Sequence, residues 1–314
     1  MPDGDSAIVE PPRFTHSAFL YDDQAAYLAF LIPFIGEGLD RDESVAVAAS
    51  TDRIALLRDT LGADAGPIHF LPADEWYVRP QRTVGAWAHL LRTAAAAGRP
   101  STRLINEIVF AAADRPWVRC ESALNRALQG LNGHLLCPYD RGALPTQLIA
   151  TAGQTHHLIY DAGWHHSDTY QEPEQLLSKL TEPPHPAGGE PVITMSIAGP
   201  IAGLRTLVRD RASAEHWLAP DRIDTLVLAL SEITTNAVRH GGPNRELRLW
   251  LTGNAVVCEV SDDGADPPGP LAGYLPPKPG AVGGMGLWLV GQVCDSLTIR
   301  ADAGHTRARF ALRR

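Results

Sequence analysis

The sequence predicts two domains of different fold class, an α/β domain with a mostly parallel sheet followed by an α+β sandwich. The chain has 314 residues, which at about 150 residues per domain favours two domains. A segment rich in proline and glycine, residues 181–191, divides the chain, and such a composition forms a stiff, solvated connector. Strands and helices alternate before this segment, whereas paired strands predominate after it. We therefore place the two domains at residues 13–180 and 192–314.

Short apolar runs alternate with longer amphipathic runs in the first domain, which is the pattern of a parallel sheet covered by helices. Pro33 lies inside the first expected helix and should kink or break it. The expected strands are residues 17–21, 44–49, 68–71, 103–108 and 134–137. The expected helices are residues 24–38, 51–61, 80–97, 117–131 and 145–154.

The second domain is expected to place helices on one face of a mixed sheet. Leu247, Leu249 and Leu251 alternate with other residues, so they share one face of a half-buried strand. The expected strands are residues 192–197, 246–251, 255–261, 297–301 and 307–312, and the expected helices are residues 201–213, 222–240 and 287–294. A loop rich in proline and glycine, residues 265–284, precedes the last of these helices.

Composition and charge exclude several classes of protein. No run approaches the roughly 18–20 apolar residues of a membrane span, and the acidic N-terminus lacks the apolar core of a secretory signal, so we expect a cytoplasmic protein without membrane contact. The first 191 residues carry a net charge of −10, and residues 192–314 carry +1. An acidic first domain disfavours direct nucleic-acid binding, because phosphate contacts need clustered Lys and Arg. The four cysteines form no C-x-x-C pair and are expected to be reduced.

One expected helix carries a row of polar side chains suited to a binding site. In LSEITTNAVRHGG, Glu232 and Asn236 are four residues apart, and Arg239 and His240 follow three and four residues later. This spacing projects all four side chains to one side of the helix. Apolar residues such as Ile233 form a separate stripe that should face the sheet. By itself, a Glu-x-x-x-Asn pair is also the ordinary pattern of a solvated helix face.

Two further segments add a carboxylate and glycines at element ends. VSDDG, residues 260–264, places a carboxylate and then a glycine at the end of a strand, where the carboxylate can accept from an exocyclic amine. GGMGLWLV, residues 283–290, leads glycines into a helix start, whose backbone N–H groups bind phosphate. Each segment alone is also compatible with a common turn or loop.

In this order and spacing, the three segments resemble the N, G1 and G2 boxes of the GHKL (Bergerat-fold) ATPases. That superfamily includes gyrase, histidine kinases and bacterial anti-sigma-factor serine kinases. The form S-E-I-T-T-N-A-V-R-H-G, with a late G-G-M-G-L-W-L-V, is most similar to the anti-sigma-factor kinase branch. The resemblance covers essentially all of residues 192–314.

The resemblance implies a site for ATP and Mg²⁺. Asn236 would ligate Mg²⁺, which takes oxygen ligands, and Glu232 would be the general base that accepts the proton of an attacking hydroxyl. Asp262 would bind the adenine amine, with Gly264 giving the ring room. The residues implied to bind the phosphates and complete the nucleotide site are Gly284, Gly286, Leu287, Arg239, His240 and Thr306.

The loop of residues 265–284 would be the ATP lid. One position departs from the family pattern D-x-G-x-G, because its second glycine is Asp266 here. A carboxylate near the base of the lid should weaken nucleotide binding. Two alternatives to a serine/threonine kinase therefore stay open: a non-catalytic module that binds a sigma factor or its antagonist and uses ATP as a switch, and a histidine kinase. The latter needs a phosphoacceptor histidine on a dimerising helix, and His185, within TEPPHPAGG, cannot be helical.

Four segments of the first domain resemble the MEDS sensory domain. They are HSAFLYDD (16–23), YVRPQ (77–81), ESALNRAL (121–128) and LCPYDRGAL (136–144). That family is named for methanogens and methylotrophs. The likeness covers about residues 13–178 and implies a RecA-like α/β fold. No Gly-Lys-Ser/Thr loop is present, so we expect this domain not to hydrolyse nucleotide.

Polar residues of the first domain form a candidate sensory site. Alternatively, Cys137 simply packs in an apolar strand, and Tyr139 and Asp140 cap a turn. The adjacent pairs His156-His157 and His165-His166 lack the i, i+4 spacing of helix-borne metal ligands, and we expect no metal there. The candidates that could converge on a ligand are His16, Glu107, Glu121, Cys137, Tyr139, Asp140 and His156.

Together the resemblances imply a serine/threonine protein kinase of the anti-sigma-factor type that regulates transcription under the control of an N-terminal sensor. The phosphoryl acceptor would be a small, STAS-type anti-sigma-factor antagonist, and a sigma factor would be a second partner. A small-molecule signal would reach the kinase through contacts between domains or within a homodimer.

Overall fold

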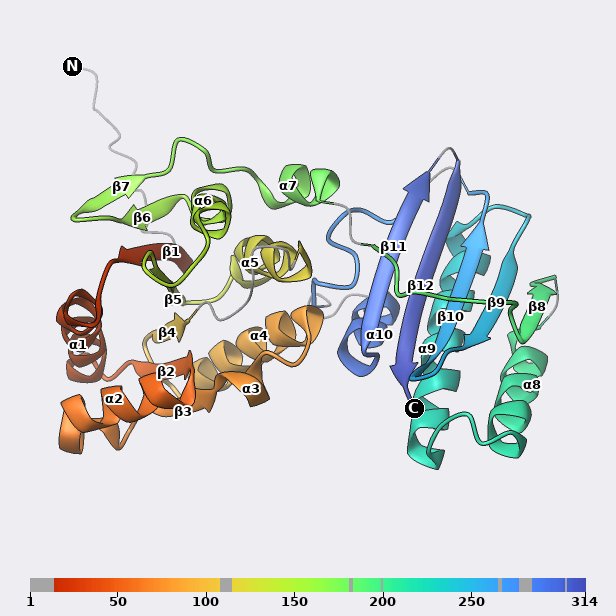
Figure 1. Cartoon of the computed structure of the whole chain (residues 1–314), viewed down its shortest axis with the longest axis horizontal. Coiled ribbons are helices and arrows are strands. Elements are labelled where there is room, and N and C mark those ends of the chain that lie inside the picture. Colours follow the sequence, from red (N-terminus) through yellow and green to blue (C-terminus); the bar gives the residue numbers. More distant parts are fainter. Residues whose placement is uncertain are drawn as a thin grey trace, which may run out of the picture. The chain divides into compact units, whose positions relative to one another are not determined.

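The computed structural model describes residues 14–107, 115–180, 183–198, 200–264, 267–276, 284–302 and 304–314. The chain folds into two compact units. The first unit consists of residues 1–76, 87–112 and 128–170, and the second of residues 77–86, 113–127 and 171–314. Figure 1 shows the elements of both. The domain limits expected from the sequence remain a prediction.

A seven-stranded sheet forms the centre of the first unit, in the order β3-β2-β4-β5-β1-β6-β7 (Figure 1). Neighbouring strands are parallel except β6 and β7, which are antiparallel. The predicted mostly parallel sheet is therefore confirmed. The strands are β1 (Phe14–Tyr21), β2 (Ser44–Ala49), β3 (His69–Pro72), β4 (Thr102–Asn106), β5 (Gly133–Asp140), β6 (Leu158–Tyr160) and β7 (Trp164–His166).

Helices α1 and α2 pack against this sheet. Leu31 and Ile35 of α1 and Leu57 of α2 are fully buried in one core with Val47 and Ile105 of the strands. Ser50 caps α2 by accepting from the backbone N–H of Arg53, which explains why the helix starts where a serine follows a strand. The helices of this half of the sequence are α1 (Gln24–Asp40), α2 (Thr51–Leu61), the 3₁₀ turn η1 (Gly62–Ala65), α3 (Ala73–Trp76), α4 (Pro80–Ala96), α5 (Arg115–Leu128), α6 (Thr146–Thr155) and α7 (Pro173–Lys179).

Pro33 does not break the first helix, which corrects one reading of the sequence. Helix α1 runs from Gln24 to Asp40 with Pro33 inside it. A proline in a helix removes one backbone hydrogen bond. The neighbours Leu31, Phe34 and Ile35 are buried in the core, and this burial keeps the turn helical across the lost bond.

The second unit contains a five-stranded sheet in the order β11-β12-β10-β9-β8. Every neighbouring pair is antiparallel, so the expectation of a mixed sheet was wrong. The reason is that β9–β10 and β11–β12 are hairpins and that β10 joins them by pairing with β12 in the antiparallel sense. The strands are β8 (Ile193–Ser196), β9 (Glu246–Leu251), β10 (Ala255–Asp262), β11 (Ser296–Asp302) and β12 (His305–Arg313).

Three helices cover one face of this sheet, as predicted (Figure 1). They are α8 (Ile201–Ala214), α9 (Pro220–His240) and α10 (Met285–Val293). Leu230 of α9 is buried in one core with Leu249 and Phe310 of the strands. The opposite face carries a smaller apolar cluster around Trp250 and Val257. Among the residues that the structure describes, no helix has the length and apolar character needed to cross a bilayer.

Asp295, between α10 and β11, connects three elements of the second unit. Its Oδ2 accepts from the backbone N–H of Arg313 at 2.8 Å and is ion-paired with the guanidinium of Arg222 on α9. Burial alone would raise the pKa of Asp295, but these two donors outweigh it and lower that pKa. The carboxylate therefore stabilises the native state above the pKa of an unfolded aspartate, about 3.9, and this stability is lost as pH falls through the native pKa.

We expect Asp295→Asn to reduce the free energy of unfolding by about 1.5–3 kcal/mol at pH 7, since it removes a charge-assisted bond. The difference from wild type should shrink as pH falls below about 4. Denaturant unfolding of the full chain at several pH values measures both effects. Asp302→Asn, at an exposed aspartate of β11, is the control and should change little. A stability difference that does not depend on pH would contradict this assignment.

Candidate functional site

A cavity of about 430 Å³ lies among α9, the ends of β10 and β12, and the start of α10. Its apolar walls come from both the helices and the sheet, and a few polar groups interrupt them. The lining residues are Ile233, Asn236, Ala237, His240, Gly241, Val260, Asp262, Pro267, Pro268, Gly269, Gly284, Gly286, Leu287, Ile299, Thr306 and Ala308. An apolar cavity with a few convergent polar groups is the usual form of a small-molecule site.

Asp262 is the buried carboxylate of this cavity and lies at the end of β10. Its Oδ1 accepts from the backbone N–H of Gly264 at 2.9 Å and of Gly242 at 3.3 Å. These two donors fix the orientation of the carboxylate, whose other oxygen still has lone pairs to accept from a ligand. The geometry therefore suits recognition of an N–H donor such as an exocyclic amine.

Two glycines allow the chain to approach Asp262 closely. A Cβ on Gly264 would lie 2.8 Å from Asp262 Oδ1 and 2.8 Å from the backbone nitrogen of Gly242. A Cβ on Gly241 would lie 2.6 Å from Asp262 Cγ. Since real Cβ contacts are essentially never this short, only glycine fits at either position without movement of the backbone.

Thr306 is the predicted site residue that β12 contributes to the cavity. In the β10–β12 pairing, Asp262 stands directly opposite Thr306, and both line the cavity. Directly opposed side chains of an antiparallel pair are neighbours. Thr306 therefore lies beside Asp262 in the cavity, and its expected role toward the phosphates stays a prediction.

Glu232 and Asn236 meet the start of α10 at Gly286. A Cβ on Gly286 would lie 2.7 Å from Glu232 Oε2 and 3.3 Å from Asn236 Nδ2, so these side chains pack against the glycine backbone. Gly284 caps the helix with a φ of 78°, in the left-handed region that favours glycine. The free N–H groups of such a helix start attract an anion.

Most, but not all, of the predicted nucleotide residues reach the cavity. Glu232 does not line it and instead contacts the Gly286 edge. Arg239 is exposed and is not among the lining residues. Asp266 lies outside the described residues, as do residues 277–283 of the expected lid. The wall formed by Pro267, Pro268 and Gly269 was expected only as part of that lid.

The apolar wall of the cavity was not predicted to contact a ligand. Val260, Ile299 and Ala308 come from three strands and line the cavity together. The alternation of apolar and polar residues predicted that they lie in strands. Only the pairing of those strands brings the three side chains to the same cavity. Among the described residues, no Lys or Arg lines the cavity. An anionic ligand here therefore depends on the helix start and on a cation for charge neutralisation.

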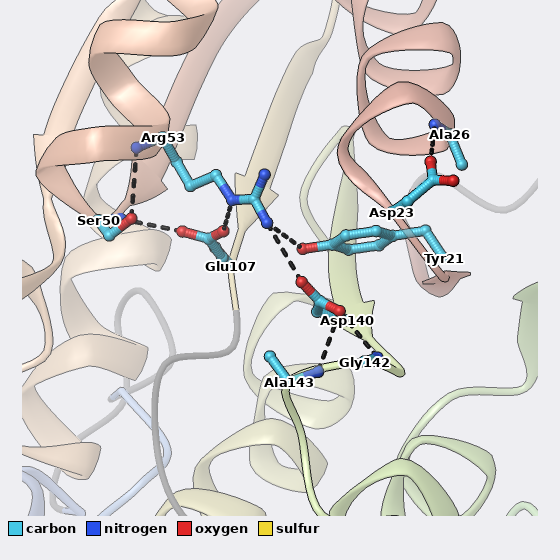
Figure 2. Close-up of polar contacts among 9 residues, drawn as sticks. All are labelled: Tyr21, Asp23, Ala26, Ser50, Arg53, Glu107, Asp140, Gly142 and Ala143. Carbon is cyan, nitrogen blue, oxygen red and sulfur yellow. Dashed lines mark hydrogen bonds and ion pairs between the residues drawn. The ribbon is translucent and has the colours of Figure 1, made fainter.

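The candidate sensory residues divide into separate groups in the structure. Glu107 and Asp140 meet at the carboxyl end of the parallel sheet of the first unit, where Arg53 binds both (Figure 2). Arg53 Nε lies 3.3 Å from Glu107, and its Nη2 lies 3.2 Å from Asp140 and 3.3 Å from the hydroxyl of Tyr21. Ligands of α/β sheets commonly bind at this edge. Arg53 was not predicted as a site residue, because its partners Glu107 and Asp140 are distant from it in the sequence.

Each carboxylate of this group also has a local structural role. Burial raises the pKa of Glu107, although the backbone N–H of Ser50 and the charge of Arg53 act in the opposite direction. Asp140 Oδ1 accepts from the backbone N–H groups of Gly142 and Ala143 at 2.9 and 3.2 Å (Figure 2). Asp140 therefore caps a turn, as the structural alternative predicted.

His16, Cys137, Tyr139 and His156 form a second group, in the interior of the first unit. His16 Nε2 lies 3.3 Å from Cys137 Sγ. The ring centroids of His16 and His156 are 4.1 Å apart, and those of Tyr139 and His156 are 5.8 Å apart. Glu121 lies on α5. The predicted set is not a single site, because Glu107 and Asp140 belong to the group around Arg53.

Comparisons with known proteins find a match to one family model in each half of the chain. Residues 15–157 match the family model described as the methanogen/methylotroph, DcmR sensory domain (MEDS). Residues 200–312 match the model described as the histidine kinase-like ATPase domain. No curated protein matches the chain.

Among solved structures, the chain is similar to the crystal structure of the RsbU and RsbW domains of Rv1364c from Mycobacterium tuberculosis. The identity is 23%, the match covers 39% of this chain and 33% of that chain, and the TM-score is 0.28. The chain thus spans about a third of the length of this solved relative.

Proposed function

We propose that this chain, which joins a MEDS sensory domain to a histidine kinase-like ATPase domain, is an ATP-dependent serine/threonine protein kinase of the anti-sigma-factor type. One observation carries the proposal. Seven residues predicted from the sequence for nucleotide binding line a single cavity within the matched ATPase region, and these are Asn236, His240, Asp262, Gly284, Gly286, Leu287 and Thr306.

The polar groups of the cavity suit the two ends of ATP. Asp262 accepts the adenine amine, and Thr306 lies beside it across the strand pair. The start of α10, opened by Gly284, offers backbone N–H groups to the phosphates. Glu232, at the Gly286 edge, accepts the proton of the attacking serine or threonine hydroxyl.

The residues present also fit Mg²⁺. The Asn236 side chain packs beside the Glu232 carboxylate against Gly286, and an amide oxygen is a ligand that Mg²⁺ accepts. Since no Lys or Arg among the described residues lines the cavity, Asn236 holds the cation that the triphosphate needs. Bound Mg²⁺ neutralises negative charge on the phosphates.

The partners follow from the family resemblance. The phosphoryl acceptor is a serine or threonine of an anti-sigma-factor antagonist of the STAS type, and a sigma factor is the second partner. The first unit supplies control by a small-molecule signal. Its charged group around Arg53 lies at the sheet edge where α/β proteins bind ligands (Figure 2).

The chemistry of the phosphorylated product tests the proposal against its rivals. Incubation with labelled ATP and candidate antagonists should give acid-stable phosphoserine or phosphothreonine. Acid-labile phosphohistidine would favour a histidine kinase, although His185 lies in an extended segment rather than a helix. ATP binding without any transfer would favour the non-catalytic switch.

Asp262→Asn should weaken ATP binding by about ten- to a hundredfold, because it replaces a charge-assisted hydrogen bond worth about 1.5–3 kcal/mol. Calorimetry of the full chain measures the affinity. Asp263→Asn is the matched control, since the Asp263 carboxylate binds Asn244 and does not line the cavity. Undiminished binding by Asp262→Asn would refute the adenine assignment.

A further inference from the structure

We infer that His16, Cys137 and His156 form a binding site for a transition-metal ion, with Zn²⁺ as the expected ion. Their ligand atoms lie within 4.8 Å of one another, and all three side chains are buried in the first unit. His16 comes from β1, Cys137 from β5, and His156 directly follows α6. Two imidazoles and a thiolate are donors that Zn²⁺ prefers.

The separation of the donors fits a shared ion. Zn²⁺ binds histidine nitrogen at about 2.0–2.1 Å and cysteine sulfur at about 2.3 Å, so two such donors in a tetrahedral shell lie about 3.5 Å apart. His16 Nε2 and Cys137 Sγ are 3.3 Å apart. The His16 and His156 rings, with centroids 4.1 Å apart, bring the third donor to the same point.

The surroundings of His156 favour its Nε2 as a metal ligand. Its Nδ1 lies 3.0 Å from the backbone oxygen of Ala152 and 2.9 Å from Thr155 Oγ1. An Nδ1–H that donates to the Ala152 carbonyl leaves the lone pair on Nε2. Metal-binding histidines are commonly oriented by such a bond from the other ring nitrogen.

The surroundings of Cys137 favour a thiolate. Asn106 Nδ2 donates to Cys137 Sγ at 3.4 Å. The orientation of that amide is fixed because the indole N–H of Trp87 donates to Asn106 Oδ1 at 3.3 Å. A donor held against the sulfur stabilises negative charge on it, which is what a metal-bound cysteine needs.

This inference replaces the expectation of no metal, which was drawn from the spacing of adjacent histidines. His16 and Cys137 are 121 residues apart, so no local spacing could reveal the cluster. The site would let the first unit respond to the metal ion itself.

Cobalt titration of the full chain tests the site. After chelation and removal of bound metal, Co²⁺ should produce one equivalent of a thiolate-to-cobalt charge-transfer band, which Zn²⁺ then removes. Cys137→Ala should abolish the band, and His156→Gln should weaken Co²⁺ binding at least tenfold. Cys258→Ala, at a cysteine equally buried in the second unit, is the matched control and should keep the band.

The wild-type titration decides the question even if a variant does not fold. If the wild-type chain shows no thiolate band, or if Cys137→Ala retains it, the inference is wrong. Zinc absorption spectroscopy should find one sulfur and two imidazoles around the ion. A shell of nitrogen and oxygen alone would indicate binding at exposed histidines such as His165 and His166 and would overturn the inference.

Discussion

Glu232→Gln should reduce phosphoryl transfer by about two to four powers of ten, which is the usual contribution of a general base. The Glu232 carboxylate lies against Gly286 at the start of α10 but does not line the cavity. In the proposed function this substitution removes the proton acceptor, whereas the residues that line the cavity are unchanged. We expect the affinity for ATP to change less than threefold.

Single-turnover transfer from labelled ATP to the antagonist measures the rate, and calorimetry measures the affinity. Asp224→Asn is the matched control, because Asp224 is an exposed carboxylate of the same helix that pairs with Arg209. It should leave both quantities at their wild-type values. If Glu232→Gln transfers phosphate at the wild-type rate, Glu232 is not the base, and the non-catalytic switch becomes the better proposal.

Asn236→Ala should abolish the part of ATP affinity that depends on Mg²⁺. In the wild type, Mg²⁺ should tighten ATP binding by about ten- to a hundredfold, equivalent to about 1.4–2.8 kcal/mol. In the variant, the affinities measured with Mg²⁺ and with a chelator should be equal. In the proposed function Asn236 supplies the oxygen ligand from α9, and no Lys or Arg among the described lining residues replaces the charge of the cation.

Two further variants sharpen this experiment. Asn236→Asp keeps an oxygen ligand and should restore the dependence on Mg²⁺, which a purely structural role would not predict. Asn254→Ala, in the exposed turn between β9 and β10, should behave like wild type. If Asn236→Ala responds to Mg²⁺ as strongly as the wild type does, the cation is held elsewhere.

Local sequence patterns predicted most of the elements. The limits of β2, α2 and β9 agree with the prediction, because turn or capping residues bound each of them. The strands β6 and β7 were missed, since three residues are too few to show alternation. The continuity of α1 through Pro33 was not predicted, because it depends on the burial of neighbouring residues in the core.

The site residues also divide into those with a local sequence signal and those that only tertiary structure brings together. Asn236, Asp262 and Gly286 line one cavity, and their segments were singled out by local residue types and by the resemblance to the GHKL boxes. Their roles, and that of Glu232, stay predictions. The position of Thr306 depends on the register between β10 and β12, which no local pattern specifies. The contacts of Arg53 and the grouping of His16 with Cys137 likewise depend on strand order.

The way in which Asp262 is held has a consequence for which nucleobase the cavity accepts. Two backbone N–H groups already bind one of its oxygens, and a carboxylate can only accept hydrogen bonds. Adenine presents an amino group to such an acceptor, whereas guanine presents a carbonyl oxygen at the corresponding ring position. Two acceptors facing each other leave both unsatisfied, at a cost of about 1–3 kcal/mol. The site should therefore discriminate against GTP by roughly ten- to a hundredfold through this one carboxylate.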